Sequence, residues 1–581
     1  MSMSNKGQEE SFIEDTEGFK SEGKPLLVIN LEEKKDIFYT QPEKMSSSDS
    51  VNHNLTTDGY KDILKHNPVS RWHKNRYIIY FSCLCIYFVS TTNGYDGSLL
   101  TALLAVPRFM TTMGIKDALG TGLVMSIFQI GQICVTVFVW LGDFIGRKPT
   151  IFIGSCIVCV GAIITALSNS YNMFVGGRFL LSFGSGLSCS LSTSYLLEIV
   201  PPNERSVLCG IYNSLYYIGS IIATWSAYGT NITYEGSDLA FRIPLWLQLL
   251  CPGIVVVLML FVPESPRFHY MKGNIDKARN FFVKYHANDD SSHPIVEYEM
   301  AQLEMSLMEF GKFTIKDYFD CRVLFKTRKD ARRSTLVVAA SWFGQFSGQA
   351  VVGYYLTTIL LDLGIENATT RLLLNGINSI LGYIFATAGS LLVGKLGRRK
   401  VFLFSNSGFI LSFTVIAACT AAFQDHGNQT AGRVGIAFIY IFNNVFFAFG
   451  YTPLQPLYPA EILSSPMRAR GMGMFQLVQG TASFVNTYAA PVAMENIRYW
   501  FYVFFVFWNI FQLCIIYFFF VETKSLTLEE IDLVFESSKP VKSSIILSRC
   551  DEESKIEKSR LAHIMIQNSI NEKPTSIVRM V

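Results

Sequence analysis

Long runs of apolar residues set the first constraint on what this chain can fold into. Examples are 150-TIFIGSCIVCVGAIITAL-167, 243-IPLWLQLLCPGIVVVLMLFV-262 and 499-YWFYVFFVFWNIFQLCIIYFFFV-521. A helix needs about 20 predominantly apolar residues to cross the hydrocarbon core of a bilayer. Only 16% of the 581 residues are charged, whereas about 25% is usual for a soluble domain. The sequence therefore predicts an all-α protein that crosses the lipid bilayer several times.

Twelve spans are predicted, six on each side of a long polar stretch. Their approximate limits are 77–105, 120–141, 150–168, 172–197, 207–229, 243–262, 333–362, 372–394, 401–423, 433–458, 470–492 and 499–521. The predicted organisation is a disordered cytoplasmic tail (1–75), a first bundle (76–262), cytoplasmic linker helices (263–332), a second bundle (333–521) and a cytoplasmic tail (522–581).

Basic residues and glycosylation sequons agree on the orientation of the spans. The loops after even-numbered spans carry most of the Lys and Arg residues, which favour the cytoplasmic side. The sequons at Asn231, Asn367 and Asn428 all fall in loops on the opposite side, where glycans are added. Both tails are therefore expected in the cytoplasm, and the plasma membrane is the expected location.

Three motifs occur twice, at a similar offset each time. GDFIGRKP (142–149) is echoed by GKLGRRK (394–400), YLLEIVPPNERS (195–206) by YPAEILSSPMRARG (458–471), and PESPR (263–267) by VETKS (521–525). Each half thus repeats six spans in the same order. Parallel repeats of this kind place a substrate site near the bilayer midplane, between the halves.

These paired motifs resemble the major facilitator superfamily and, within it, the sugar porter family. The resemblance covers about residues 75–535, and PESPR and VETKSLTLEE are its most specific parts. The stretches 342-WFGQFSGQAVVGYYLTTIL-360 and 451-YTPLQPLYPAEIL-463 look most like the fungal lactose-permease-like branch. The resemblance implies two six-helix bundles that move a sugar by alternating access, without enzyme activity and without a cofactor.

Asp96 lies inside the first predicted span, in 94-GYDGSLL-100. A charge there costs a few kcal/mol, so it needs a partner or a function. Arg178 lies at a similar depth in the fourth span and could offset that cost. The resemblance implies that Asp96 and Arg178 form a proton-coupling pair. A purely structural buried pair remains the alternative.

Four charged residues are expected at the inner ends of spans: Arg147, Glu198, Arg398 and Glu461. Pairs of Arg and carboxylate side chains there could tie the bundles together when the inner gate is shut, and would break when it opens. The alternative is that these Arg residues only anchor the inner side.

Neutral amide and aromatic side chains are the expected substrate contacts, because sugars present arrays of hydroxyl groups. The candidates are Asn213, Gln345, Gln349, Tyr354, Tyr355, Gln455 and Asn486. Gly344, Gly348 and Gly353 would let the seventh span bend or break nearby. Gly344 and Pro456 depart from the pattern of hexose carriers, which favours a disaccharide. For each candidate, hydrogen bonding between helices is the alternative.

The predicted function is transport of a sugar, such as lactose or a hexose, in symport with a proton. A net charge of +3 is too small to indicate nucleic acid as a partner, and no metal site or ATP-binding loop is visible. Uniport, a transporter-like nutrient sensor, and an inositol or cyclic acid as the substrate remain open.

Overall fold

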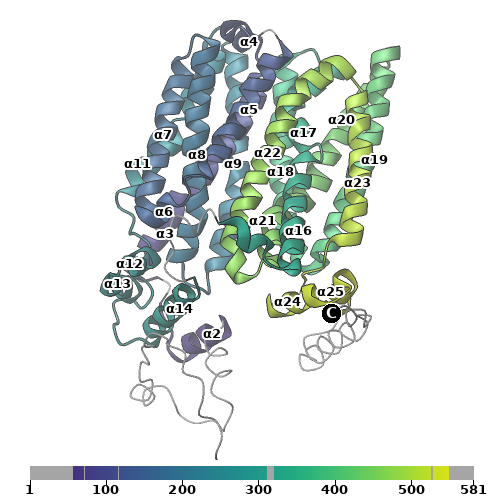
Figure 1. Cartoon of the computed structure of the whole chain (residues 1–581). Coiled ribbons are helices and arrows are strands. Elements are labelled where there is room, and N and C mark those ends of the chain that lie inside the picture. The colour runs from purple at the N-terminus through teal and green to yellow at the C-terminus, as the bar shows by residue number, and fades with distance from the viewer. Residues whose placement is uncertain are drawn as a thin grey trace, which may run out of the picture. The chain divides into compact units, whose positions relative to one another are not determined.

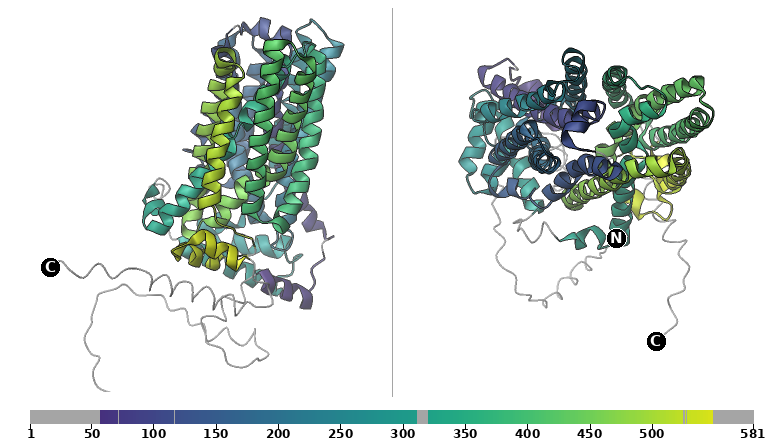
Figure 2. Two further views of the ribbon diagram at one scale, coloured as in Figure 1. Left: turned by 90° about the vertical axis from the view of Figure 1, so that its right-hand side faces the viewer. Right: turned by 90° about the horizontal axis from the view of Figure 1, so that it is seen from above.

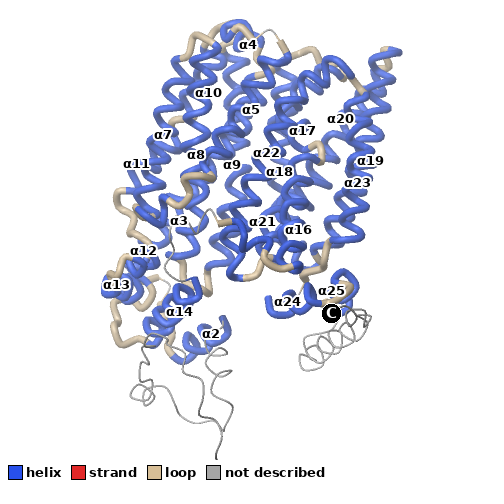
Figure 3. Tube along the Cα trace, viewed as in Figure 1, coloured by secondary structure: helices blue, strands red, loops and turns tan. Residues whose placement is uncertain are grey.

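The computed structural model describes residues 57–70, 72–115, 117–310, 320–524, 526 and 528–548. Among these residues every regular element is a helix, and none is a β-strand (Figure 3). Most of the two predicted tails, residues 1–56 and 549–581, lies outside the described residues.

The first half of the chain contains helices at all six predicted spans. The first five are α3 (Lys74–Leu103), α5 (Ala118–Val135), α7 (Arg147–Leu167), α8 (Tyr171–Ile199) and α9 (Arg205–Thr233). The sixth is divided into α10 (Leu239–Leu247) and α11 (Leu250–Met259), with Pro244 inside α10. Two short helices, α4 (Pro107–Met113) and α6 (Leu141–Phe144), lie in the connections.

The second half also follows the predicted spans, but two of them are interrupted. The seventh span comprises α16 (Arg328–Phe346) and α17 (Gln349–Asp362), and the tenth comprises α20 (Gln429–Tyr440), the π-helix η3 (Ile441–Tyr451) and α21 (Thr452–Ile462). The uninterrupted spans are α18 (Ala368–Leu396), α19 (Arg398–His426), α22 (Ser465–Ile497) and α23 (Trp500–Phe519). The seventh span breaks at Gly348, whose φ of 100° favours glycine, as the spacing of its glycines predicts.

Eight of these segments are long and apolar enough, by length and composition, to cross a membrane. They are α5, α7, the greater part of α9, α10–α11, α18, α19, α20–α21 and α23. The other four predicted spans, α3, α8, α16–α17 and α22, contain more polar residues. In α3 and α8 these include Asp96 and Arg178, which are buried. A helix that faces the interior of a bundle can hold such residues, because it is shielded from lipid.

The closest packing is between helices of the first half, and the halves are joined mainly by two helix pairs, with a smaller contact between α3 and α17. In the first half α7 packs against α8 and α3 against α9, and in the second half α19 packs against α23 and α16 against α22. Between the halves α5 lies along α22 and α9 along α18 (Figures 1 and 2). The α5–α22 contact depends on Gly122, where a β-carbon would come within 2.7 Å of the Tyr488 carbonyl oxygen.

Short helices contact one end of the spans (Figure 1). The linker forms α12 (Pro266–Met271), α13 (Ile275–Tyr285), α14 (Pro294–Phe310) and η2 (Cys321–Phe325), of which α12 contacts α8 and α13 contacts α3. After the last span come α24 (Leu528–Glu536), which contacts α16 and α21, and α25 (Pro540–Leu547).

The structure differs from the prediction of a disordered tail over residues 1–75. Residues Thr57–His66 form the helix α2, which packs against α14. Tyr60 is buried against Ile295 and Tyr298, and Ile63 and Leu64 cover the same cluster. Apolar residues at i, i+3 and i+4 give this short helix a face that it can bury.

Candidate functional site

Polar side chains of the two halves meet in the interior between them. Gln129 Nε2 on α5 donates to Tyr354 Oη on α17 at 2.9 Å. Further hydrogen bonds join Ser220 to Ser379 (3.1 Å), Tyr217 to Thr452 (3.3 Å), Asn231 to Thr369 (3.2 Å), Thr101 to the Gly353 carbonyl (3.2 Å) and Thr357 to the Thr101 carbonyl (3.0 Å). The contact surface between the halves is therefore lined by hydroxyl and amide groups.

The predicted substrate contacts on α17 have different surroundings. Gln349 Oε1 is buried and has no hydrogen-bond partner among the described residues. Tyr354 is partly buried and faces α5 through its bond with Gln129. Tyr355 is 1% exposed and donates to the Thr487 carbonyl at 2.7 Å, which is a contact within the second half. Tyr354 thus faces the first half, whereas Tyr355 supports the packing of α17 within the second half.

Gln455 and Asn486 both contact α16 within the second half. The Gln455 side chain lies over Gly344, and its Nε2 atom has no hydrogen-bond partner among the described residues. Asn486 donates to the carbonyl of Gln345 at 3.0 Å, so it stabilises the end of α16 in this structure. The amide of Gln345 is partly buried, and Asn213 on α9 is exposed.

A group of three asparagines belongs to the same region and was not predicted as a site. Asn378 on α18 accepts hydrogen bonds from Asn443 (3.1 Å) and Asn444 (2.9 Å), both on η3. Asn444 Oδ1 is buried without a hydrogen-bond partner among the described residues. A π-helix inside a longer helix often marks a functional site. In the sequence, the visible signal was the pair of adjacent asparagines, Asn443 and Asn444, inside an apolar run.

The structure brings Asp96 and Arg178 together, but not as the predicted ion pair of side chains. Arg178 Nη2 donates to the backbone carbonyl of Asp96 at 3.1 Å. The carboxylate instead accepts a hydrogen bond from Gln248, between α10 and α11. Both Asp96 and Arg178 are almost fully buried, at 0% and 2% exposed, and Arg178 also lies over the ring of Phe128. Gln248 was missed, although a glutamine inside an apolar run was a visible signal.

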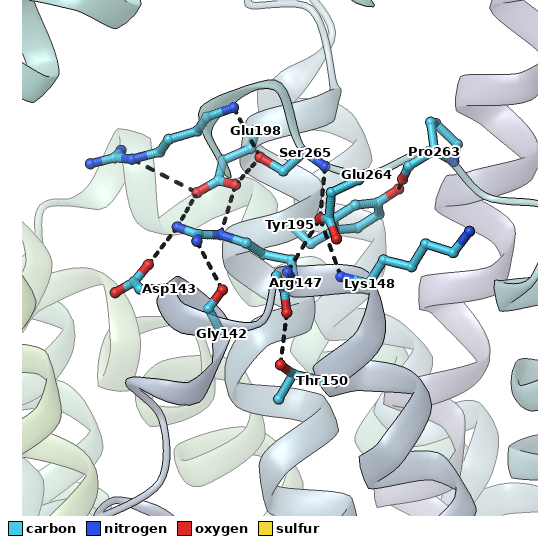
Figure 4. A network of polar contacts seen from close by, with 12 residues as sticks. Gly142, Asp143, Arg147, Lys148, Thr150, Tyr195, Glu198, Pro263, Glu264 and Ser265 are labelled. Carbon is cyan, nitrogen blue, oxygen red and sulfur yellow. Dashed lines mark hydrogen bonds and ion pairs between the residues drawn. The ribbon is translucent and has the colours of Figure 1, made fainter. Parts of the chain in front are cut away.

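At one end of the first half, Arg147 connects three segments (Figure 4). Its guanidinium pairs with Glu198 at the end of α8 at 3.1 Å and with Asp143 at 2.8 Å. Glu198 also accepts a hydrogen bond from the hydroxyl of Ser265, which precedes α12. The pair Arg147–Glu198 therefore lies within the first half in this structure.

The second half repeats this arrangement. Arg398 pairs with Glu461 at the end of α21 at 2.5 Å. Thr523 donates to the other oxygen of Glu461 at 2.5 Å, in the same way that Ser265 donates to Glu198. Both predicted pairs thus connect segments of one half, and their role in gating stays a prediction.

Two further carboxylates complete these networks, and both were missed. Glu264 of the PESPR motif accepts from the backbone N–H groups of Arg147 (3.2 Å), Lys148 (3.3 Å) and Ser265 (2.8 Å) (Figure 4). Glu522 of the VETKS motif accepts from Arg398 (2.8 Å) and Arg399 (3.2 Å) in the same manner. Each carboxylate caps the N-terminus of a helix, where unpaired N–H groups favour negative charge. Burial nevertheless raises the pKa of Glu264. The repetition of the two motifs was the signal that could have found both residues.

The three sequon asparagines differ in exposure. Asn231 is 5% exposed and bonded to Thr369, whereas Asn367 and Asn428 are exposed. Asn367 caps α18 and Asn428 caps α20 through their side-chain oxygens.

Two six-helix bundles with polar residues between them define a membrane transporter of the major facilitator fold. The MFS (major facilitator superfamily) proton:xylose symporter XylE from E. coli, bound to 6-bromo-6-deoxy-D-glucose, has this fold. It matches 79% of this chain and all of its own, with a TM-score of 0.63 and 18% sequence identity. The family model described as "Sugar (and other) transporter" matches residues 82–535. The chain belongs to this family.

Curated relatives cover most of the chain. The sugar transporter STL1 of Saccharomyces cerevisiae is 27% identical over 459 residues, which are 76% of this chain and 78% of the relative. A quinate permease of Neurospora terricola is 25% identical over 480 residues, which are 79% and 89% of the two chains. The chain is thus a multi-pass membrane transporter, as the sequence predicts, and not an enzyme.

Proposed function

We propose that this protein moves a sugar across the membrane by alternating access between its two halves. The observation that carries the proposal is a set of three buried amide atoms without a hydrogen-bond partner in the described part of the chain, Gln349 Oε1, Gln455 Nε2 and Asn444 Oδ1. Buried polar atoms normally have partners. The hydroxyl groups of a sugar would supply them, since each can donate and accept. The relative named a sugar transporter supports the same substrate class.

We further propose that transport is coupled to a proton through Asp96. The carboxyl group is fully buried in α3, near the contacts of α3 with α17. Protonation would remove the cost of its buried charge and change the balance between the two conformations. A uniporter with a structural Asp96 is the alternative, and it predicts flux that ignores a pH gradient.

A cyclic polyol acid is a second candidate substrate. Arg178 makes its hydrogen bond to a backbone carbonyl, and its Nε atom has no hydrogen-bond partner among the described residues. A guanidinium that is not paired with a carboxylate can bind an anionic substrate. One relative is named a quinate permease, which supports quinate as the particular acid to test.

We place the protein in the plasma membrane with both tails in the cytoplasm. Basic residues at the end that carries Arg147 and Arg398 support this orientation. A disaccharide such as lactose is our first substrate, because Gly344 and Pro456 replace larger residues of hexose carriers.

Uptake in transporter-deficient cells tests these proposals. Labelled lactose, hexoses and quinate would be supplied with and without a proton uncoupler, and surface expression would be measured in parallel. Uptake of a sugar that the uncoupler and Asp96→Asn both abolish supports sugar–proton symport. Uptake indifferent to both identifies a uniporter, and uptake of quinate alone identifies the acid as the substrate. Asp238→Asn is the matched control, since Asp238 pairs with Arg108 away from the interior.

A further inference from the structure

The carboxylate of Asp96 is held by a neutral amide. Gln248 Nε2 donates to Asp96 Oδ1, and Asp96 Oδ2 has no hydrogen-bond partner among the described residues. Gln248 is 2% exposed, and its own Oε1 also lacks such a partner. Gln248 therefore presents an unused acceptor next to a buried carboxylate.

Several other titratable or charged groups lie near Asp96, but the hydrogen bond to its carboxylate comes from Gln248. The titratable and charged groups around the carboxylate are Arg178 and Cys189 on α8, Tyr216 on α9, Cys251 on α11, and the adjacent Tyr95 on α3 itself. Tyr95 donates to the Pro244 carbonyl at 2.7 Å, and Arg178 donates to the backbone of Asp96. Arg178 is the only cation in this set.

We propose that Gln248 is the positioning residue of Asp96 in both of its protonation states, an inference that rests on the proposed proton coupling. When Asp96 is ionised, the Gln248 amide donates its N–H to the carboxylate, as the structure shows. When a proton adds to a carboxylate oxygen, the new O–H donates to Gln248 Oε1 after the amide turns over. No bond to Arg178 has to form or break in this exchange.

The chemistry of the amide explains why this position suits a glutamine. An amide carries both a donor and an acceptor, so it can bond to a carboxylate or to a carboxylic acid. A cation in the same place would stabilise the ionised form alone. Gln248 lies at the break between α10 and α11, and its side chain reaches Asp96 on α3.

The pH profile of transport tests the role of Gln248. Gln248→Leu keeps a similar volume but removes both the donor and the acceptor, and the ionised form loses more because its hydrogen bond is to a charged group. We expect the half-maximal pH of sugar exchange to move by about one unit toward alkaline pH, since a hydrogen bond to a charged group has that strength. The shift should vanish when Gln248→Leu is combined with Asp96→Asn. Gln512→Leu is the matched control, because Gln512 is also fully buried but contacts no carboxylate in the described structure.

The outcomes separate this inference from the proposed function. Wild-type uptake that collapses with an uncoupler, together with an unshifted Gln248→Leu profile, would overturn the role of Gln248 and leave proton coupling intact. A shift that persists in the double variant would also overturn it, since the effect would not act through Asp96. Wild-type uptake and exchange that ignore both uncoupler and pH would overturn the coupling and the inference together.

Discussion

Gln455 of α21 lies directly over Gly344 of α16, so that a β-carbon on Gly344 would come within 2.3 Å of Gln455 Nε2. The two residues belong to the two interrupted spans of the second half. The absence of a side chain at Gly344 therefore creates the space in which Gln455 Nε2 lies.

Gly344→Ala is expected to displace the Gln455 amide and to weaken substrate binding. If that amide donates one hydrogen bond to the sugar, the KM for uptake should rise about tenfold. The KM is measured from initial rates at equal surface expression. Gly176→Ala is the control, because a β-carbon there would meet no atom within 4 Å. An unchanged KM in Gly344→Ala would show that Gln455 does not touch the substrate.

Gly146→Ala and Gly397→Ala should each lower the stability of the folded protein. The two glycines have φ values of 121° and 95°, and a β-carbon would lie 2.5 Å from Glu264 Oε2 and 2.8 Å from Glu522 Oε2. A residue other than glycine in such a conformation costs about 1–3 kcal/mol. Thermal unfolding in detergent measures the loss. Gly253→Ala is the comparison, and equal melting temperatures in all three variants would refute the argument.

Tyr60→Ala should release α2 from the linker helices. The Tyr60 ring lies 5.7 Å from that of Tyr298, and burial, followed by the charge of Glu299, raises the pKa of Tyr60. Removing a buried aromatic ring lowers the stability of the packed structure by about 3 kcal/mol. A helix as short as α2 is not stable without such packing. Limited proteolysis should then cut within residues 57–70. Tyr60→Phe keeps the ring and should resist cleavage, so identical digestion of both variants would contradict this packing.

Glycans are expected on Asn367 and Asn428 but not on Asn231. The first two are exposed, whereas Asn231 is buried against α18 and donates to Thr369. In a eukaryotic host, Asn367→Gln and Asn428→Gln should each increase gel mobility, with no further change after endoglycosidase once both are combined. A mobility change in Asn231→Gln would show that this asparagine is modified before α9 packs.

The sequence predicted the spans well because a bilayer imposes its thickness on every crossing helix. The break near Gly348 was also predictable, since three glycines stand close together in the seventh span. The short helix α2 was not, because its apolar face is small and its stability comes from contact with α14, far away in the chain.

The site was predicted less completely, since side-chain partners depend on how helices rotate against each other. Asp96 and Arg178 were found from their unusual charge, and they do lie together. In the structure Arg178 donates to the backbone of Asp96, whereas Gln248 donates to its carboxylate. Residue spacing in the sequence does not predict this choice of partners, because it depends on the positions of individual atoms. Tyr355 and Tyr354 are adjacent in sequence, yet they face different helices.

The two inner-end networks have a consequence for how the chain is assembled. Glu264 with Arg147 and Glu198 ties the ends of three spans of the first half, and Glu522 with Arg398 and Glu461 does the same for the second. In each network, all three of these residues belong to the same half. Each network therefore forms within one half, and two separately synthesised polypeptides, divided between α14 and η2, would each carry these residues of their own network before they meet.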